Sequence, residues 1–254
     1  MMNNASILIT GATSGIGEAL ALYYAKQGIA HLFISGRDKD RLADVKGRCE
    51  AIAESLHVHA ELIDVTDVET MRHWIEKAEQ IAPLNIVIAN AGVSTGEETE
   101  ANVRNTVQTN VCGVVNTILP AITAYQQNQT EDKHLVLLSS IAGYHGLPTA
   151  PSYSASKAFV KAWGEALRLS LKKDKIRVSV VCPGFVRSRI TAKNTCPMPF
   201  LMEAEKAAEI IADGIEKNRG IIAFPWPLRF VSWVMSCLPN VVSDFIYENL
   251  PKKV

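Results

Sequence analysis

The stretch Thr10-Gly-Ala-Thr-Ser-Gly-Ile-Gly17 follows the short apolar run Ile7-Leu8-Ile9 and precedes a helical pattern that reaches about Gln27. A strand, a glycine-rich turn and a helix in this order are typical of the first unit of a nucleotide-binding parallel sheet. Glycines let the backbone approach a ligand closely, and the N–H groups at a helix N-terminus attract phosphate. The spacing Gly-x3-Gly-x-Gly therefore indicates a pyrophosphate-binding turn; the alternative is the same turn without a ligand.

Working outward from this turn, short apolar, β-branched runs alternate with longer helical patterns. Runs of this kind suit strands that are covered on both faces. The predicted strands after Ile7–Ile9 are 31–35, 57–62, 86–89, 135–138, 178–182 and 221–223, and the predicted helices after the first are 66 to before Pro83, 100–127 and 152–173. The alternation predicts an α/β protein with a doubly wound Rossmann fold, a seven-stranded parallel sheet and helices on both faces. No repeat or linker interrupts it, so we expect one domain over residues 1–254.

Composition excludes several classes of protein. The 254 residues carry 26 Lys and Arg against 26 Asp and Glu, and 48% are hydrophobic. This balance excludes a mainly disordered chain and argues against a nucleic-acid binder. The five cysteines are widely spaced and form no ligand-like cluster, so we expect free thiols, no metal site and a cytoplasmic protein. The segment Met1–Ser6 has neither the basic nor the apolar region of a signal peptide.

The end of the second predicted strand bears on cofactor choice. An acidic residue here would bind the ribose 2′-hydroxyl of NAD, whereas an arginine suits the 2′-phosphate of NADP. The sequence has Arg37 after Ser35-Gly36, with Asp38 next. We expect NADP(H), with NAD(H) less favoured; the alternative is that Arg37 is a surface charge opening the next helix.

A candidate acid–base pair lies in Tyr153-Ser-Ala-Ser-Lys157, where four-residue spacing places both side chains on one helical face. A nearby lysine charge favours the phenolate and lowers the tyrosine pKa, which suits acid–base catalysis. The alternative is an ordinary exposed pair. Other polar or glycine motifs end strands, namely Asn90-Ala-Gly92, Ser139-Ser140 and Pro183-Gly184. The carboxyl ends of strands are where open α/β sheets bind ligands.

Taken together, these motifs resemble the short-chain dehydrogenase/reductase family, in its branch of roughly 250 residues. The resemblance extends from about Ser6 to about Ala223 and rests on the motifs in order: Thr10–Gly17, Asp64-Val65, Asn90–Gly92, Asn110, Ser140, Tyr153/Lys157 and Pro183-Gly184. It implies hydride transfer between NAD(P)(H) and an alcohol or carbonyl carbon. It also implies a homo-oligomer, dimer or tetramer, with helices 100–127 and 152–173 as the candidate interface.

The resemblance also implies roles for individual residues. Tyr153 would be the proton donor in reduction or the base in oxidation, and Ser140 would hydrogen-bond the substrate oxygen. Lys157 would lower the Tyr153 pKa and hold the nicotinamide ribose, and Asn110 would interrupt its helix and position a water beside Lys157. The implied cofactor contacts, besides Tyr153, Lys157 and the Arg37 discussed above, are Gly11, Ser14, Ile16, Gly17, Asp64, Val65, Asn90, Ala91, Gly92, Pro183, Gly184, Val186 and Ser188.

The substrate side is defined less closely by the sequence. The variable lid of the family falls at 189–202, and its second half is apolar. We therefore expect a hydrophobic carbonyl or alcohol substrate, unless these residues only pack the lid against the core. Two other functions remain open. One is a catalytically idle NADP(H)-binding regulatory protein on the same fold, and the other is a membrane-surface, lipid-modifying reductase.

The second of these rests on the apolar C-terminal segment, residues 224–254. Its uncharged run Phe230–Ser243 has 14 residues, short of the ~20 that a spanning helix requires. We expect no transmembrane segment and a terminal segment buried on its own core. The alternatives are a substrate lid, a subunit interface and a membrane-surface patch, to which Lys252 and Lys253 would contribute.

Overall fold

The computed structural model describes residues 4–128, 130, 132–193 and 197–249. Several features named above lie outside these residues. They are Met1–Asn3 of the amino-terminal segment, residues 194–196 of the expected lid, and Lys252 and Lys253.

Seven strands form one parallel sheet, as the sequence predicts. The sheet order is β3-β2-β1-β4-β5-β6-β7, and each neighbouring pair is parallel. At the centre of the sheet, Leu8 of β1 lies beside Phe33 of β2 on one side and Val87 of β4 on the other. The strands are β1 Ser6–Ile9, β2 His31–Gly36, β3 His57–Leu62, β4 Ile86–Ala89, β5 Lys133–Leu138, β6 Ile176–Pro183 and β7 Ile221–Phe224.

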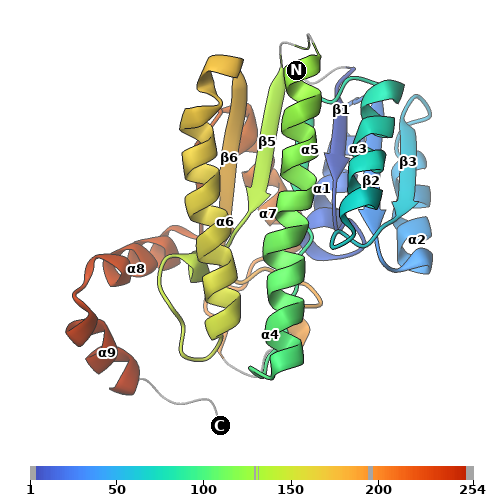
Figure 1. The fold of residues 1–254 in the computed structure, drawn as a ribbon. Helices are drawn as coiled ribbons and strands as arrows, with labels where there is room; N and C mark the ends of the chain where they lie inside the picture. Colours follow the sequence, from blue (N-terminus) through green and yellow to red (C-terminus); the bar gives the residue numbers. More distant parts are fainter. Residues whose placement is uncertain (1–3, 129, 131, 194–196, 250–254) are drawn as a thin grey trace.

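Helices cover both faces of this sheet (Figure 1). One buried cluster joins the sheet to α1, α2 and α7, through residues such as Leu20 and Ile211. The other joins it to α3, α5 and α6, through Ile118 and Val160 among others. The helices are α1 Gly15–Ala25, α2 Lys39–Glu50, α3 Val68–Ile81, α4 Glu100–Val107, α5 Gly113–Gln127, α6 Pro151–Ser170, α7 Ala204–Glu216, α8 Trp226–Cys237 and α9 Asn240–Asn249. The doubly wound fold is thereby confirmed.

The start of α3 differs from the helix predicted to begin at residue 66. The helix begins at Val68, and its cap is Asp67, whose carboxylate accepts a hydrogen bond from the Thr70 backbone N–H. Thr66 cannot cap it because its hydroxyl donates to Asp64 at the end of β3, at 2.9 Å. A carboxylate at the cap also interacts favourably with the helix dipole.

The long helical segment 100–127 is interrupted where the resemblance implies. Between α4 and α5 the residues Gln108–Cys112 form one turn of π-helix. Such a turn admits an extra residue and commonly lies at a functional site. It turns the fully buried Asn110 toward the strand ends.

The C-terminal segment contradicts the expectation that it is buried on its own core. The last described residues form α8 and α9, which extend from the β7 edge of the body (Figure 1). No residue of α8 is buried, and Trp226 is 77% exposed. The prediction was wrong because apolar composition indicates a tendency to be covered and does not specify the covering surface.

No helix among the described residues combines the length and apolarity needed to cross a bilayer.

Candidate active site

A pocket of about 360 Å³ opens at the carboxyl ends of the strands. It is lined by the turn after β1, the ends of β2, β4, β5 and β6, the start of α6 and part of the lid. Of the residues predicted for the site, it brings together Gly11, Ser14, Ile16, Arg37, Val65, Asn90, Ala91, Gly92, Ser140, Tyr153, Lys157, Pro183, Gly184, Val186 and Ser188. Gly17, Asp64 and Asn110 are not among the residues that line the pocket.

The glycine turn is shaped by steric limits that only glycine meets. Gly11 and Gly15 have φ values of +67° and +59°, in the left-handed region that disfavours other residues. A Cβ on Gly17 would lie 2.4 Å from both the Asn90 side-chain nitrogen and the Gly11 carbonyl oxygen. The turn therefore presents bare backbone to the pocket directly before the N-terminus of α1, which fits a pyrophosphate group.

The amide of Asn90 holds this turn in place. Its Nδ2 donates to the carbonyl oxygens of Thr10 and Gly11, at 2.9 and 3.0 Å. The Thr10 hydroxyl in turn accepts from the backbone N–H groups of Asn90 and Ala91. Asn90 thus ties the end of β4 to the glycine turn, and its backbone lines the pocket.

Charged residues gather at the ends of β2 and β3. Arg37 pairs with Asp64 at 3.4 Å, and Arg41 pairs with Asp38 at 2.6 Å. Both arginines line the pocket, and so does Asp38. The sequence analysis missed Arg41, although it lies only four residues after Arg37. Its Nε is buried without a hydrogen-bond partner, which leaves a donor for an anionic group.

Tyr153 and Ser140 meet at one end of the pocket. Burial around the phenol raises the pKa of Tyr153, and its hydrogen bond with the Ser140 hydroxyl acts in the opposite direction. This differs from the lowered pKa expected from Lys157, because desolvation dominates here. The Ser140 hydroxyl also donates to the Pro183 carbonyl at 3.3 Å and caps the short helix Ile141–Gly143.

The Lys157 ammonium lies deep beside this pair. Lys157 is only 4% exposed, and its Nζ donates to the Leu138 carbonyl at 2.9 Å. The Nζ is 5.8 Å from the centre of the Tyr153 ring. Burial lowers the pKa of Lys157 to about 8, because a charged group loses hydration there.

Asn110 supports the same corner from the π-helical turn. Its Oδ1 accepts from the Val93 backbone N–H at 2.8 Å, and its Nδ2 donates to the Val93 carbonyl and to Ser156. A Cβ on Gly92 would approach both Asn110 Oδ1 and Lys157 Nζ, each at 3.3 Å. The Asn110 amide and the Lys157 ammonium therefore flank one glycine.

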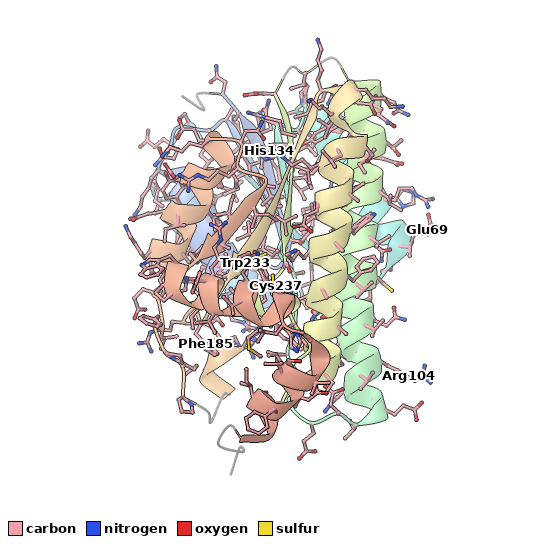
Figure 2. All side chains as sticks on the ribbon, turned by 90° about the vertical axis from the view of Figure 1, so that its left-hand side faces the viewer. Glu69, Arg104, His134, Phe185, Trp233 and Cys237 are labelled. Atoms are coloured by element: carbon pink, nitrogen blue, oxygen red, sulfur yellow. The ribbon has the colours of Figure 1, made fainter. Side chains whose placement is uncertain are left out.

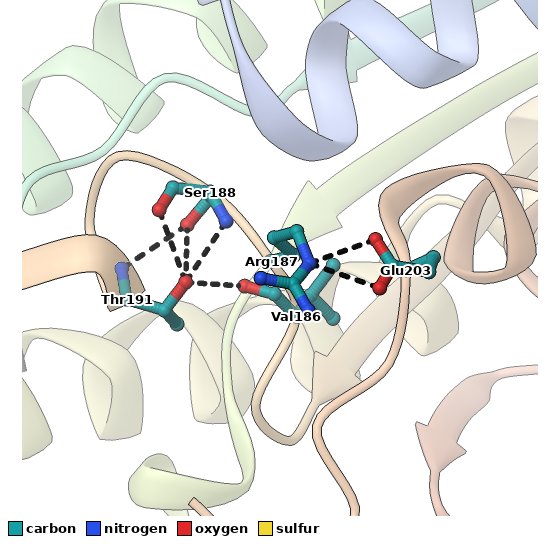
Figure 3. A network of polar contacts seen from close by, with 5 residues as sticks. All are labelled: Val186, Arg187, Ser188, Thr191 and Glu203. Atoms are coloured by element: carbon teal, nitrogen blue, oxygen red, sulfur yellow. Dashed lines mark hydrogen bonds and ion pairs between the residues drawn. The ribbon is translucent and has the colours of Figure 1, made fainter.

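The loop after β6 forms the wall nearest the lid. Thr191 donates to the Val186 carbonyl and accepts from the Ser188 backbone N–H, as Figure 3 shows. Arg187 pairs with Glu203 at 2.9 Å in the same view. These contacts hold Val186 and Ser188 against the pocket. Thr13 and Gly15 of the glycine turn, Ser94, and Arg189 and Thr191 of the lid also line the pocket, although they were not named among the implied cofactor contacts.

The apolar half of the expected lid divides into two parts. Met202 forms a bridge with Val186 and packs against the core. Phe200, by contrast, is 58% exposed. Packing on the core therefore explains Met202 but does not explain Phe200.

No group of three or more His, Cys, Asp or Glu side chains within the described part of the chain is arranged to hold a metal ion.

Comparison with known proteins identifies the family. Residues 5–197 match the family model described as short chain dehydrogenase. An uncharacterised oxidoreductase from Myxococcus xanthus is 37% identical, and the match covers 96% of each chain. An uncharacterised oxidoreductase from Mycobacterium tuberculosis is 34% identical, with 90% of this chain and 93% of the relative covered.

A solved structure shares the whole fold. A short-chain dehydrogenase from Sphingobium yanoikuyae in complex with NADPH superposes with a TM-score of 0.79, covers 98% of both chains and is 22% identical. With the family model and the two relatives, this establishes that the chain belongs to the short-chain dehydrogenase family and is an oxidoreductase.

Proposed function

We propose that this protein is an NADP(H)-dependent oxidoreductase that transfers hydride between nicotinamide and a carbonyl or secondary alcohol. The convergence of Tyr153, Ser140 and Lys157 in the pocket that also contains the glycine turn carries the proposal. When bound, the cofactor would supply or accept the hydride. The glycine turn would hold its pyrophosphate, as the fit of Gly11, Gly15 and Gly17 suggests.

The chain's own groups account for proton handling. A raised pKa keeps the Tyr153 phenol protonated at neutral pH, so it can donate a proton to a carbonyl oxygen. Ser140 would hydrogen-bond that oxygen and orient it. As Tyr153 loses its proton, the Lys157 ammonium stabilises the phenolate charge. Asn110 would keep a water beside Lys157, in the corner that both side chains flank.

The test is turnover of a panel of ketones, followed by NADPH absorbance. Tyr153→Phe should lower kcat by about 10²–10⁴-fold, the range of general acid–base catalysis. Tyr23→Phe is the matched control: it makes the same substitution at a tyrosine that does not line the pocket, and it should leave kcat near the wild-type value. Turnover that survived Tyr153→Phe would contradict the proposal.

The preference for NADP(H) rests on Arg37 and Arg41. Both guanidinium groups line the pocket at the end of β2, and Arg41 has a buried, unpartnered donor. The NADPH complex of the Sphingobium yanoikuyae protein is consistent with this choice. Arg37→Asp should weaken NADPH binding far more than NADH binding. If Arg37→Asp changed the ratio of the NADPH and NADH dissociation constants twofold or less, the preference for NADP(H) would be refuted. The loss of one charged contact should change this ratio by more than that.

A hydrophobic substrate completes the proposal. It is supported by the apolar second half of the lid, where Phe200 is exposed, and by Tyr144, which lies four residues after Ser140 and whose pKa burial raises to about 12. A higher kcat/KM for small polar sugars than for aromatic or medium-chain ketones would contradict this part.

A catalytically idle regulator is the weaker candidate, because this chain retains Tyr153, Lys157 and Ser140 together in one pocket. Cofactor binding without Tyr153-dependent turnover would favour it.

Assembly and location are part of the same proposal. A homodimer or homotetramer would cover Leu119 on α5 and Leu169 on α6, which are 51% and 76% exposed. A cytoplasmic location accords with the free thiols of Cys49 and Cys182, both buried. Light scattering and cell fractionation test the two points separately.

A further inference from the structure

The loop after β6 carries into the pocket an arginine that has no role in the function proposed above. Among the described lining residues four are cationic, namely Arg37, Arg41, Lys157 and Arg189, and Asp38 is the only acidic one. A lining with this excess of positive charge favours an anionic ligand. Of the four cations, Arg189 alone comes from the lid, so it approaches the pocket from a different element than the arginines at the end of β2.

The two arginines at the end of β2 already have acidic partners. Arg37 pairs with Asp64 at 3.4 Å, and Arg41 pairs with Asp38 at 2.6 Å. The side chain of Arg189 makes no ion pair or hydrogen bond with any residue in the described part of the chain. The charge of Arg189 is therefore not neutralised by a direct contact there, although its guanidinium belongs to a pocket wall.

The course of the loop brings Arg189 next to the glycine turn. A Cβ on Gly15 would lie 2.8 Å from the Cβ of Ser188, so the loop passes directly over the start of α1. The backbone N–H groups at this helix N-terminus are the groups that attract phosphate. Because Arg189 follows Ser188 and lines the same pocket, it lies beside the place where the turn would hold a pyrophosphate.

The charge of Arg189 also acts on the β2 side of the pocket. Hydrogen bonds from Arg41 are the main cause of the lowered pKa of Asp38, and the charges of Arg41 and Arg189 act in the same direction. The Asp38 carboxylate is engaged by the Arg41 guanidinium and backbone N–H. Arg189 therefore attracts Asp38 without a direct contact, and its positive potential extends between the glycine turn and the end of β2.

Hydrogen bonds hold this part of the lid in a defined turn, which Figure 3 shows. The Thr191 hydroxyl accepts from the Ser188 backbone N–H at 2.8 Å and donates to the Val186 carbonyl at 2.9 Å. The Thr191 backbone N–H donates to the Ser188 hydroxyl at 3.3 Å. Arg189 lies within this turn, so its backbone loses little conformational freedom when the guanidinium binds a ligand.

We propose that Arg189 is a cofactor-binding residue, which contacts a phosphate of the dinucleotide from the lid. A planar guanidinium forms two parallel hydrogen bonds with a phosphate, which a lysine cannot do. The pyrophosphate is the expected target, since Ser188 lies on Gly15. The 2′-phosphate of NADP(H) offers the same chemistry. The inference rests on the proposed function, because it requires that the pocket bind a nicotinamide dinucleotide.

Calorimetric titration of the full-length protein with NADPH and with NADH, in the absence of substrate, tests the proposal. Arg189→Gln should weaken the binding of both cofactors about tenfold or more, the scale of one charge-assisted contact. Arg189→Lys retains the charge without the planar fork and should recover part of this loss. The matched control is Arg104→Gln, which removes the same charge from α4, outside the pocket lining, and should bind both cofactors as wild type does. Figure 2 labels Arg104.

Salt distinguishes a phosphate contact from a change in the structure of the loop. Salt screens an exposed charge–charge contact, so the difference between wild type and Arg189→Gln should narrow as NaCl is raised from about 0.1 M to about 1 M. A difference of the same size at both concentrations would overturn the proposal. A loss of NADPH affinity alone would support the phosphate contact and assign it to the 2′-phosphate. Thermal unfolding verifies that each variant is folded.

The same titrations separate this inference from the proposed function. If wild type bound NADPH and Arg189→Gln bound both cofactors within about twofold of wild type, the role of Arg189 would be overturned, because a charged contact contributes more than that. The proposed reductase activity would stand, since it is tested through Tyr153. If wild type bound neither NADPH nor NADH, the proposed function and this inference would both be overturned.

Discussion

The buried corner around Lys157 and Asn110 and the exposed helix α8 hold their side chains in opposite ways. In the corner, Lys157 and Asn110 are buried and each donates or accepts identified hydrogen bonds. On α8, large apolar side chains face outward and no residue is buried. The corner is specified by internal contacts, whereas the large apolar side chains of α8 remain exposed to solvent.

The first way to sharpen this comparison is to remove apolar volume from each region. Ile118→Ala, at a fully buried position, should cost about 2–5 kcal/mol of unfolding free energy because it leaves a cavity. Trp226→Ala should change stability by less than about 0.5 kcal/mol, because its side chain is mostly in water already. Urea denaturation measures both, and a large loss for Trp226→Ala would mean that α8 is packed on the body.

The second prediction concerns the buried charge of Lys157. Its folded pKa is about 8, below the usual 10.5, so the unfolded chain binds more protons between these values. The free energy of unfolding therefore rises with pH between about 8 and 10.5. Below pH 8 the folded protein bears the whole cost of burying the charged Lys157 ammonium. Lys157→Met should stabilise the protein by up to about 3 kcal/mol at pH 7, and the difference should vanish above pH 10.5. Thermal unfolding of wild type and Lys157→Met at a series of pH values tests this prediction. A stability difference between them that did not change with pH would contradict the lowered pKa of Lys157.

The third prediction compares two glycines. Gly17→Ala should cost about 1–3 kcal/mol and weaken cofactor binding, because the added methyl would collide with Asn90 and the Gly11 carbonyl. Gly47→Ala, in the middle of α2 with no atom near the added methyl, should stabilise by about 0.5–1 kcal/mol. Calorimetry measures the stability of the two variants and titration measures their cofactor affinity. If Gly17→Ala and Gly47→Ala had equal effects, the close packing around Gly17 would be refuted.

The smallest expected effect is that of Ser156→Ala. The Ser156 hydroxyl accepts from Asn110 and donates to the Tyr153 carbonyl. Its loss should cost about 1 kcal/mol in urea denaturation. Ser156→Thr, which retains the hydroxyl, should recover part of this loss; an unchanged protein in both cases would show that the contact contributes nothing.

Much of the site could be predicted because its chemistry depends on local pattern. The glycine turn, Tyr153/Lys157 and the strand-end motifs each occupy a few consecutive residues, and parallel strands bring their carboxyl ends to one edge. Arg41 shows where this reasoning stopped. Its place in the pocket depends on how α2 leaves β2, and its buried Nε is visible only in three dimensions.

The pKa of Tyr153 shows a second limit. Residue spacing indicated a lysine one helical turn away and hence a lowered pKa, but the Lys157 ammonium is 5.8 Å from the phenol ring and bound to the Leu138 carbonyl. Burial then dominates and raises the pKa. The balance between desolvation and charge depends on distances that a sequence does not contain.

What the sequence determined by itself is the seven strands and part of the helices, because hydrophobic period and turn chemistry act over a few residues; α2, α7, α8 and α9 were not among the predicted helices. The strands β1 to β7, their parallel direction and the family motifs followed from it, whereas the order of the strands in the sheet came from the structure. Only the tertiary structure decided which apolar residues are covered. Val178 lies between neighbouring strands and is fully buried, while the equally apolar Phe230 projects from α8. The physical reason is that burial requires a complementary surface, and that surface comes from residues distant in sequence or from another molecule.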